Sequence, residues 1–140
     1  MKYWNDAITL YNRYEDKQTN AIQWCRHILI NCFVKRTNNK INIGGEQLVT
    51  DDIIIRIPNQ YNYKKPCEWV NISDDIRFNY ITLQPGDLIF LGKVFEDIDE
   101  YTAGQRSNDL ISKYKLLGSI FVTAVNINDF MPGAHYLVRG

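Results

Sequence analysis

The stretch Thr82–Val94, "TLQPGDLIFLGKV", gives the clearest structural signal in the chain. At its centre, Gln84-Pro85-Gly86-Asp87 predicts a type II turn, because proline presets φ at the second position and glycine supplies the positive φ needed at the third. The residues on either side predict one strand over Tyr80–Leu83 and another over Leu88–Phe95. We therefore expect this turn to fix the register of an antiparallel sheet.

Further strands are predicted on both sides of this turn. Ile22–Lys35 is long enough for a helix, but its aromatic and β-branched residues favour a strand, with a bulge or bend near Ile30–Cys32. The other predicted strands are Ala7–Tyr14, Asp52–Ile57 with Pro58 at its end, Ser119–Ile127, and His135–Arg139 after a turn over residues 128–133.

Two short helices are expected. Pro66 suits the first position of one helical turn in "PCEWVNIS". Ser107–Leu117 has a capping residue in Ser107, opposite charges at its two ends, and Gly118 as its stop. Together these elements predict a mainly β single domain over residues 1–140, a small antiparallel barrel or sandwich with long inserted loops at residues 36–50 and 59–79.

Composition narrows the class of protein. The chain has 140 residues, with 16 Lys and Arg against 16 Asp and Glu, and this balance argues against a dedicated nucleic-acid binder. Residues 1–70 carry a net charge of +3 and residues 71–140 one of −3. A difference of this size arises by chance, and it is also expected of a protein that stacks end to side with copies of itself. No signal peptide or membrane-spanning apolar run is visible.

The side chains that could carry chemistry form no recognised motif. Three cysteines without a CxxC pair indicate free thiols in a reducing compartment. Ordinary packing is favoured over a metal site for Cys25, His27, Cys32, Cys67 and His135, because zinc ligands usually come in close pairs. No nucleophile signature or P-loop is present. We therefore expect neither an enzyme nor a cofactor, with a small β-barrel hydrolase as the remote alternative.

Two segments are candidates for contacts with partners. The acidic run Glu96–Glu100 reads as a solvated loop, as an edge protected against wrong pairing, or as a docking strip for a basic partner. Rings alternate with positive charge over Tyr61, Tyr63, Lys64, Lys65 and Trp69, which suits a protein interface or stacking on nucleic-acid bases. Of these two we favour a protein interface.

Several short motifs follow one another along nearly the whole chain. They are "ITLYNRYEDKQT", Trp24 with Arg26, Ile57-Pro58, Pro66 with Glu68-Trp69, "TLQPGDLIFLGKV", Asp109-Leu110 with Lys113-Tyr114, and the ending "FVTAVNINDFMPGAHYLVRG". Read in this order, they resemble one family of small tailed-phage proteins. Members are encoded among the head and tail structural genes of phages and prophages of Gram-positive bacteria. The chain departs from the family pattern at Asn31–Phe33 and at Tyr136.

The resemblance implies a non-enzymatic virion protein, similar in size and β pattern to head-closure (stopper) and head–tail connector proteins. Such a protein forms a ring of copies in the neck, between a portal or adaptor protein and a tail terminator or tail protein, and lies near packaged DNA. It assembles in the host cytoplasm, without a membrane. The loops Arg36–Thr50, which includes Lys40, and Asn59–Trp69 are the expected contacts, with the termini as secondary ones.

Two alternatives remain open at this point. One is a tail-side adaptor or tail-completion protein, which would use the same scaffold on the other side of the neck. The other is a phage-encoded anti-defence or host-factor binding protein, which would act outside the particle.

Overall fold

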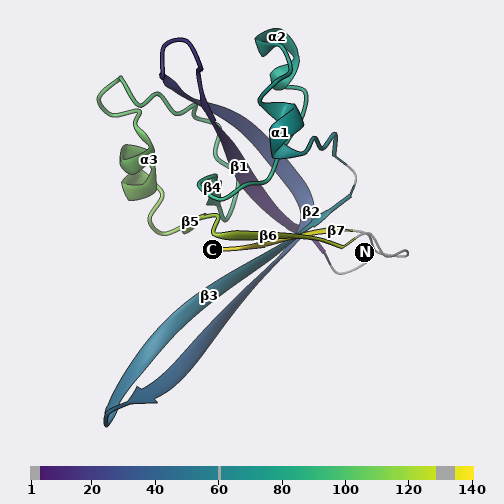
Figure 1. Ribbon diagram of the computed structural model, residues 1–140. Helices are drawn as coiled ribbons and strands as arrows, with labels where there is room; N and C mark the ends of the chain where they lie inside the picture. The colour runs from purple at the N-terminus through teal and green to yellow at the C-terminus, as the bar shows by residue number, and fades with distance from the viewer. Residues whose placement is uncertain (1–3, 60, 129–134) are drawn as a thin grey trace.

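The computed structural model describes residues 4–59, 61–128 and 135–140. Over these residues the chain is mainly antiparallel β structure with three short helices, which confirms the predicted fold class (Figure 1). The strands are β1 (Asp6–Glu15), β2 (Ile22–Ile43), β3 (Glu46–Pro58), β4 (Leu88–Phe90), β5 (Ser119–Phe121), β6 (Ala124–Asn128) and β7 (His135–Arg139). They form one curled sheet in the order β5-β4-β1-β2-β3-β7-β6.

The two outermost strands of this sheet, β5 and β6, are successive parts of one chain segment. β5 pairs with β4, and β6 pairs with β7. Between them the N–H of Val122 donates to Asp87 O at 2.8 Å and that of Thr123 donates to Arg139 O at 2.8 Å. The single strand expected over Ser119–Ile127 is therefore broken where it passes from one end of the sheet to the other, which brings the two ends of the curled sheet together.

The predicted turn at Gln84–Asp87 is confirmed. Gly86 has φ +97°, and the N–H of Asp87 donates to Gln84 O at 3.2 Å. The buried Asp87 carboxylate accepts hydrogen bonds from the Asn12 side chain at 2.9 Å and from the N–H of Arg13 at 2.9 Å. These bonds attach the turn to β1 and so fix the register of β4.

The strands expected on either side of the turn are shorter than predicted. Tyr80–Leu83 forms no regular strand: Ile81 makes one isolated parallel bridge with Tyr63, and Thr82 bonds to the Asn12 side chain. β4 ends at Phe90 rather than Phe95, because the Thr9 hydroxyl takes over the pairing there. It donates to Gly92 O at 2.7 Å and accepts from the N–H of Val94 at 2.8 Å.

Side chains cover both faces of the sheet formed by β4, β1 and the first half of β2. Ile8, Leu10 and Leu29 pack with Ile81 and Leu83 on one face, beside the helices α1 (Pro66–Trp69) and α2 (Asp74–Arg77). The opposite face carries a second cluster under the segment with α3 (Ser107–Lys113); its buried members are Tyr11, Leu88, Phe90, Val94, Ile98 and Leu110. Figure 1 shows α1 and α2 on one side of β1 and α3 on the other.

The helices agree with most of the sequence expectations. α1 begins at Pro66 as predicted. α3 spans fewer residues than expected, and its N-cap is Arg106 rather than Ser107. Gly118 follows with φ +92° and donates to Tyr114 O at 3.2 Å, in the role predicted for it. None of the described helices has the length and apolar character needed to cross a membrane.

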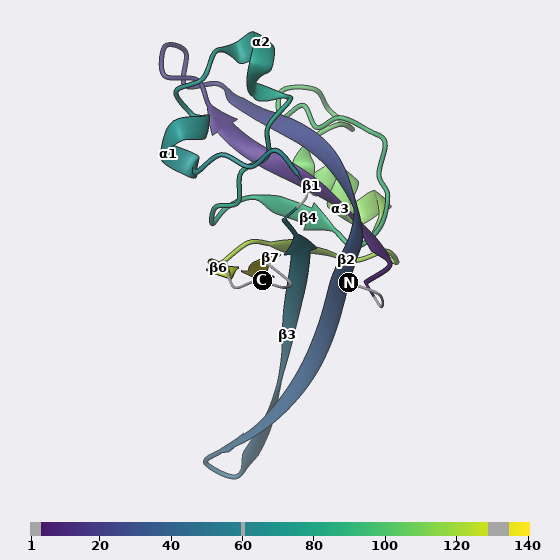
Figure 2. The same cartoon turned by 90° about the vertical axis from the view of Figure 1, so that its right-hand side faces the viewer.

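The largest departure from the sequence prediction is a projecting β-hairpin, which we call the arm and define as residues 37–52. A loop was expected over residues 36–50, whereas β2 and β3 stay paired out to Ile43 and Glu46. Gly44 and Gly45, with φ +59° and +85°, form the two-residue turn at its tip, a turn that needs positive φ at both residues. Figure 2 shows the arm extending away from the rest of the described chain, which we call the body.

The predicted bulge in β2 is confirmed and marks the change from body to arm. The β1–β2 register shifts between the pairs Ile8↔Leu29 and Asp6↔Cys32, so β2 has one extra residue there. Asn31 within it has φ +59°. The turn expected over residues 128–133 lies almost entirely outside the described residues.

Candidate functional site

The first half of β2 has a neighbouring strand on one side only. β1 pairs with β2 from Ile22 to Cys32, and β3 pairs with β2 only from Phe33 onward. β3 ends at Pro58, a residue that cannot donate a backbone hydrogen bond to a sheet. In the part of the chain that the structure describes, no strand therefore lies along the other edge of β2 over Ile22–Ile30.

The register identifies which backbone groups this edge presents. The backbone N–H and C=O groups of the odd-numbered residues of β1 point toward β4. The bond from the Arg13 N–H to the Asp87 carboxylate shows this direction. Even-numbered residues of β1 therefore exchange hydrogen bonds with odd-numbered residues of β2. By alternation, the N–H and C=O groups of Trp24, Arg26 and Ile28 point away from β1, toward the unpaired side.

A tyrosine hydroxyl lies at each end of this edge. Tyr61 Oη accepts from the N–H of Ile30 at 2.6 Å and donates to its carbonyl at 2.9 Å. Tyr101 Oη accepts from the N–H of Ile22 at 3.0 Å. None of the described residues supplies a hydrogen bond to the outward backbone groups of Trp24, Arg26 and Ile28. We call this stretch of β2, Ile22–Ile30, the open edge.

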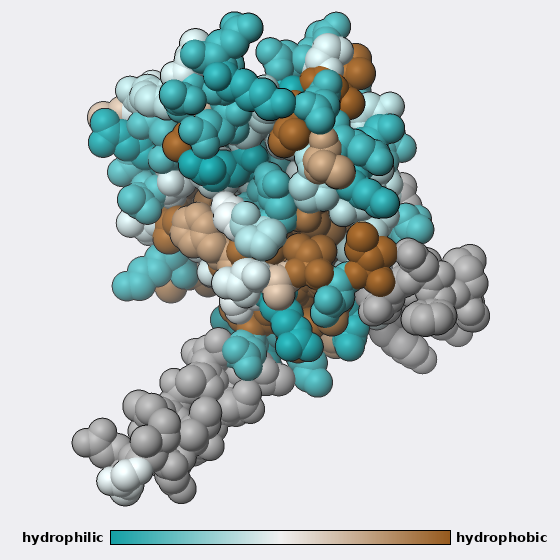
Figure 3. All heavy atoms as spheres, viewed as in Figure 1, coloured by the Kyte–Doolittle hydropathy of each residue, from teal (hydrophilic) through white to brown (hydrophobic). Residues whose placement is uncertain are grey.

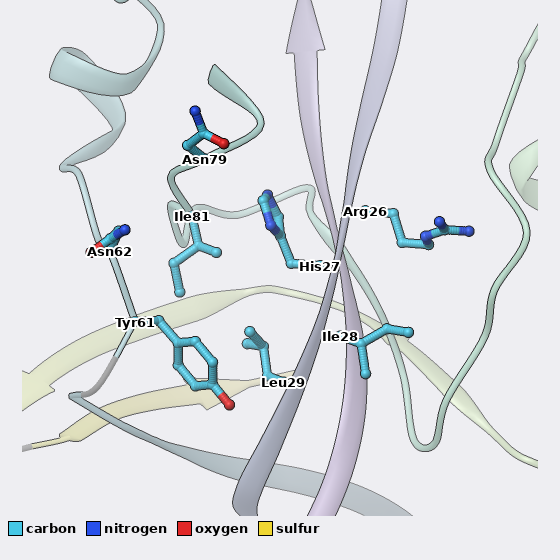
Figure 4. A pocket seen from close by; sticks show the side chains of 8 residues that line it. All are labelled: Arg26, His27, Ile28, Leu29, Tyr61, Asn62, Asn79 and Ile81. Carbon is cyan, nitrogen blue, oxygen red and sulfur yellow. The ribbon is translucent and has the colours of Figure 1, made fainter. Parts of the chain in front are cut away.

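Two cavities follow one another along the open edge. The first, of about 400 Å³, is lined by Arg26, His27, Ile28, Leu29, Tyr61, Asn62, Asn79 and Ile81. Figure 4 shows His27, Asn79 and Ile81 on one side of β2 and the Arg26 side chain on the other. The second, of about 590 Å³, is lined by Ala21, Ile22, Gln23, Trp24, Phe78, Asp97, Ile98, Asp99 and Tyr101. The open edge thus runs along a groove between the coverings of the two sheet faces.

The groove combines hydrogen-bonding groups with exposed rings. Phe78 and Tyr101 are 60% and 65% exposed. Trp24 Nε1 and His27 Nε2 are buried and have no hydrogen-bond partner among the described residues. Burial lowers the pKa of His27 to about 4, so its ring is neutral at physiological pH. The unpaired backbone groups of the open edge, together with the exposed rings, suit the binding of a polypeptide.

One wall of the groove is acidic. Arg26 donates to Phe95 O and lies 3.4 Å from the Asp97 carboxylate, whose side chain is 81% exposed. Asp99 is exposed and accepts from Thr102 Oγ1 at 2.7 Å. The acidic run predicted as a loop or a docking strip therefore lies beside the open edge, with one cation close to Asp97.

One family model matches residues 3–140 of the chain, and its description is "Family of unknown function (DUF6751)". The chain belongs to this family. No curated protein matches the chain, and no solved structure matches it. Membership of DUF6751 by itself assigns no activity to the chain.

The residues predicted as contacts pack largely against the body of the DUF6751 chain. Tyr61 anchors one end of the open edge and lines the first cavity. Tyr63 packs against Tyr136 with the rings tilted by 31° and their centroids 4.5 Å apart. Lys64 Nζ lies 5.0 Å from the ring centre of Tyr80. Tyr63 and Lys64 therefore contact other residues of the same chain, and Tyr61 is the predicted contact residue that lines the groove.

Trp69 corrects the sequence expectation, because it is fully buried in the chain's own core and not accessible to a partner. Its ring meets Tyr14 edge to face at 5.9 Å, and the Arg77 guanidinium lies 3.8 Å from the centre of the Tyr14 ring. Lys65 is exposed and precedes α1. Lys40 lies in the arm, where it pairs with Val49.

The cysteines are all free, and two of them are buried. Burial raises the pKa of the Cys25 thiol to about 11 and that of Cys32 to about 12, which disfavours the thiolate. Within residues 4–59, 61–128 and 135–140, no three His, Cys, Asp or Glu side chains cluster in a way that could hold a metal ion.

Sequence reasoning did not find the open edge. It predicted that β2 is a strand and that Pro58 ends β3, but not how the two overlap. The signal that could have found it is the difference in length between two predicted strands. The strand Asp52–Ile57, which ends at Pro58, is too short to pair along the whole of Ile22–Lys35.

Proposed function

We propose that this protein is a non-enzymatic structural component of the neck of a tailed-phage virion, a head-closure or head–tail connector protein that forms a ring of copies between portal and tail. The proposal begins from the ordered motifs that resemble the small tailed-phage proteins. Family membership leaves it open, since the family has no known function.

The observation that carries the proposal is the arm. Its two strands pair with each other, while β7 and Gly140 reach β3 only from Ile53 to Pro58. At about 3.3 Å per residue the arm extends roughly 20 Å beyond the last paired neighbour. A two-stranded hairpin alone is marginally stable in water, so a ribbon of this length is expected to find its third neighbour in another subunit.

The surface of the body supports an assembly role as well. Figure 3 shows apolar residues gathered over the middle and lower part of one face, with hydrophilic residues over most of the upper part. Large exposed apolar side chains include Phe121 and Ile127, which are 47% and 43% exposed. Grouped apolar surface of this kind is typical of proteins that are partly covered by neighbours.

A tail-side adaptor or tail-completion protein would use the same arm and body, so the geometry favours neither side of the neck. A host-factor binding protein is the alternative of a different class. The open edge favours it as a second candidate, because a strand of a foreign protein could add there as well as a strand of a neighbouring copy.

The test is the protein content of purified particles from the phage or induced prophage that encodes the chain. We expect the chain in those particles at a fixed multiple that matches the portal symmetry. Deleting its gene should give DNA-filled or leaking heads without joined tails. Absence of the chain from particles, together with capture of one host protein, would overturn the neck assignment in favour of the host-factor alternative.

A further inference from the structure

The strand β2 contains two stretches that each have an unpaired edge, the open edge and the first strand of the arm. The open edge lies in the first half of β2, and the arm contains the end of the same strand, residues 37–43. Because both belong to one continuous strand, interrupted only by the bulge at Asn31, they cannot reach each other within one copy. They can meet only between two copies.

We propose that the first strand of the arm of one copy adds as a new strand to the open edge of the next copy. This inference rests on the ring of copies in the proposed function and names the contact that builds it. The partner is a second copy of this chain, and the recognition is main-chain hydrogen bonding along β2, with the groove walls beside it.

The backbone groups on the two sides are complementary. The bulge adds one residue, so the alternation of β2 changes phase there. Beyond it, the N–H of Val34 points to the β1 side and donates to the Asp6 carboxylate at 3.0 Å. By the same alternation the backbone groups of Asn38, Lys40 and Asn42 point away from β3. This row of donors and acceptors matches the row at Trp24, Arg26 and Ile28.

Charge selects the first strand of the arm over the second. In the sequence the first strand of the arm carries Lys40 and no acidic residue, whereas the second carries Glu46, Asp51 and Asp52. The groove wall carries the acidic run, including the exposed carboxylates of Asp97 and Asp99. The basic strand is attracted to this wall and the acidic strand is repelled by it, which fixes which edge docks.

The contact joins different surfaces of the two copies. Each copy offers its arm to one neighbour and its open edge to another, so the interface is heterologous and every added copy leaves one arm and one edge free. Such a contact closes into a ring when the rotation between copies allows it, and otherwise continues as a filament. The difference in charge between the two halves of the chain agrees with end-to-side stacking of this kind.

The experiment measures amide exchange by NMR on the full-length ¹⁵N-labelled chain, from dilute solution up to about millimolar concentration, with the oligomeric state followed by sedimentation. We expect exchange protection at Trp24, Arg26 and Ile28 to increase with concentration as oligomers form. The amides of Cys25 and His27 already face β1 and should not change. Lack of concentration-dependent protection at the three outward amides would overturn the inference.

Two proline variants form a matched pair. Asn38→Pro removes an outward-facing donor from the first strand of the arm, and Val49→Pro does the same on the second strand; neither removes a β2–β3 hydrogen bond. We expect Asn38→Pro to abolish the concentration-dependent protection and Val49→Pro to leave it. The reverse result, or equal assembly of both variants, would contradict the docking of the first strand.

A charge-reversal variant tests the same contact without a proline, in case a proline substitution disturbs the arm. Lys40→Glu should weaken self-association about fivefold at low salt, as expected for one exposed ion pair, with the effect shrinking as salt is added. Thr50→Glu on the second strand is the control and should change little. Equal effects of the two variants would count against the assignment.

Failure of this inference and failure of the proposed function look different. If the chain is present in particles but Asn38→Pro assembles like the unmodified chain, the neck function stands and the arm contact is wrong. If the chain self-associates through the open edge but is absent from particles, the contact stands and the neck function is wrong.

Discussion

The body and the arm contain parts of the same strand, β2, yet different interactions hold them. In the body, β2 lies against β1, and Leu29 and Cys32 are buried in the core. In the arm, β2 pairs with β3 alone, joined by the turn at Gly44-Gly45. The body is stabilised by burial, and the arm by main-chain pairing and turn geometry.

This difference shows why the arm suits a role in contacts. Residues of the body are constrained by many neighbours, so most changes there alter stability. Among the described strands, the arm continues into the body only at its base, so its sequence can serve a partner with little cost to the fold. If the two regions are independent, the effect of a substitution stays within the region where it is made.

The largest effect is expected in the core of the body. Trp69→Ala removes a fully buried ring that packs on Tyr14 and Arg77, and should lower the free energy of unfolding by about 3–5 kcal/mol. Urea unfolding measures the change. Phe95→Ala is the control, because Phe95 is 70% exposed and its loss should change stability by no more than about 0.5 kcal/mol. Similar losses for both would show that the body is not held by this cluster.

A somewhat smaller effect is expected at the turn that fixes the sheet register. Asp87→Ala leaves the Asn12 side-chain amide and the N–H groups of Arg13 and Gln84 without their acceptor, and should cost about 3 kcal/mol. Glu15→Ala, at an exposed position on the same strand as Arg13, should be close to neutral. An Asp87→Ala chain as stable as the parent would refute the role given to this carboxylate.

The free energy of unfolding should depend on pH through two groups with opposite effects, Asp87 and His27. Burial raises the pKa of Asp87 to about 7, outweighing its N–H donors, so the folded chain holds a proton that the unfolded chain loses above about pH 4. That contribution makes stability fall as pH rises from about 4 to 7. Burial lowers the pKa of His27 to about 4, so its contribution makes stability rise over about pH 4 to 6.5.

Single variants separate these two contributions. His27→Gln should give a free energy of unfolding that falls with pH, and Asp87→Ala one that rises with pH, each by at most about 1.4 kcal/mol per pH unit. The unmodified chain should change less than either variant over about pH 4 to 6.5. Urea titrations at several pH values measure these slopes, and identical slopes for all three chains would contradict both pKa shifts.

The smallest effect is expected in the arm and should stay there. Gly45 has φ +85°, so Gly45→Ala should destabilise the hairpin by about 1 kcal/mol. Amide exchange of residues 37–52 should become faster, with no change in urea unfolding of the body. Gly44→Asn makes the Asn-Gly pair that this turn type prefers and should leave exchange unchanged. If Gly45→Ala also weakens the body, the arm is not an independent region.

Local chemistry explains what the sequence predicted well. The turn at Gln84–Asp87, the helix start at Pro66 and the stop at Gly118 each depend on the conformational preference of a single residue. The bulge in β2 was visible as an interruption of its alternating pattern. These features need no knowledge of distant partners, so the sequence contains them directly.

The remaining features depend on residues far apart in the chain. The arm was predicted as a loop because residues 36–47 are largely polar, whereas the strand conformation of Thr37, Asn38 and Asn39 comes from pairing across the turn with residues 50–52. Trp69 was placed at the surface because its burial depends on Tyr14 and Arg77. The open edge follows only from the register of three strands, which no local pattern contains.

The two-residue turn at the tip also limits how the hairpin can change in evolution. Its closing pair, Ile43 and Glu46, must be a hydrogen-bonded one, and such pairs alternate with non-bonded ones along the ribbon. Insertions and deletions that keep this turn must therefore come in steps of two residues per strand, or about 7 Å of reach. Relatives should differ in length here by multiples of four codons, and intermediate lengths should bring a different loop.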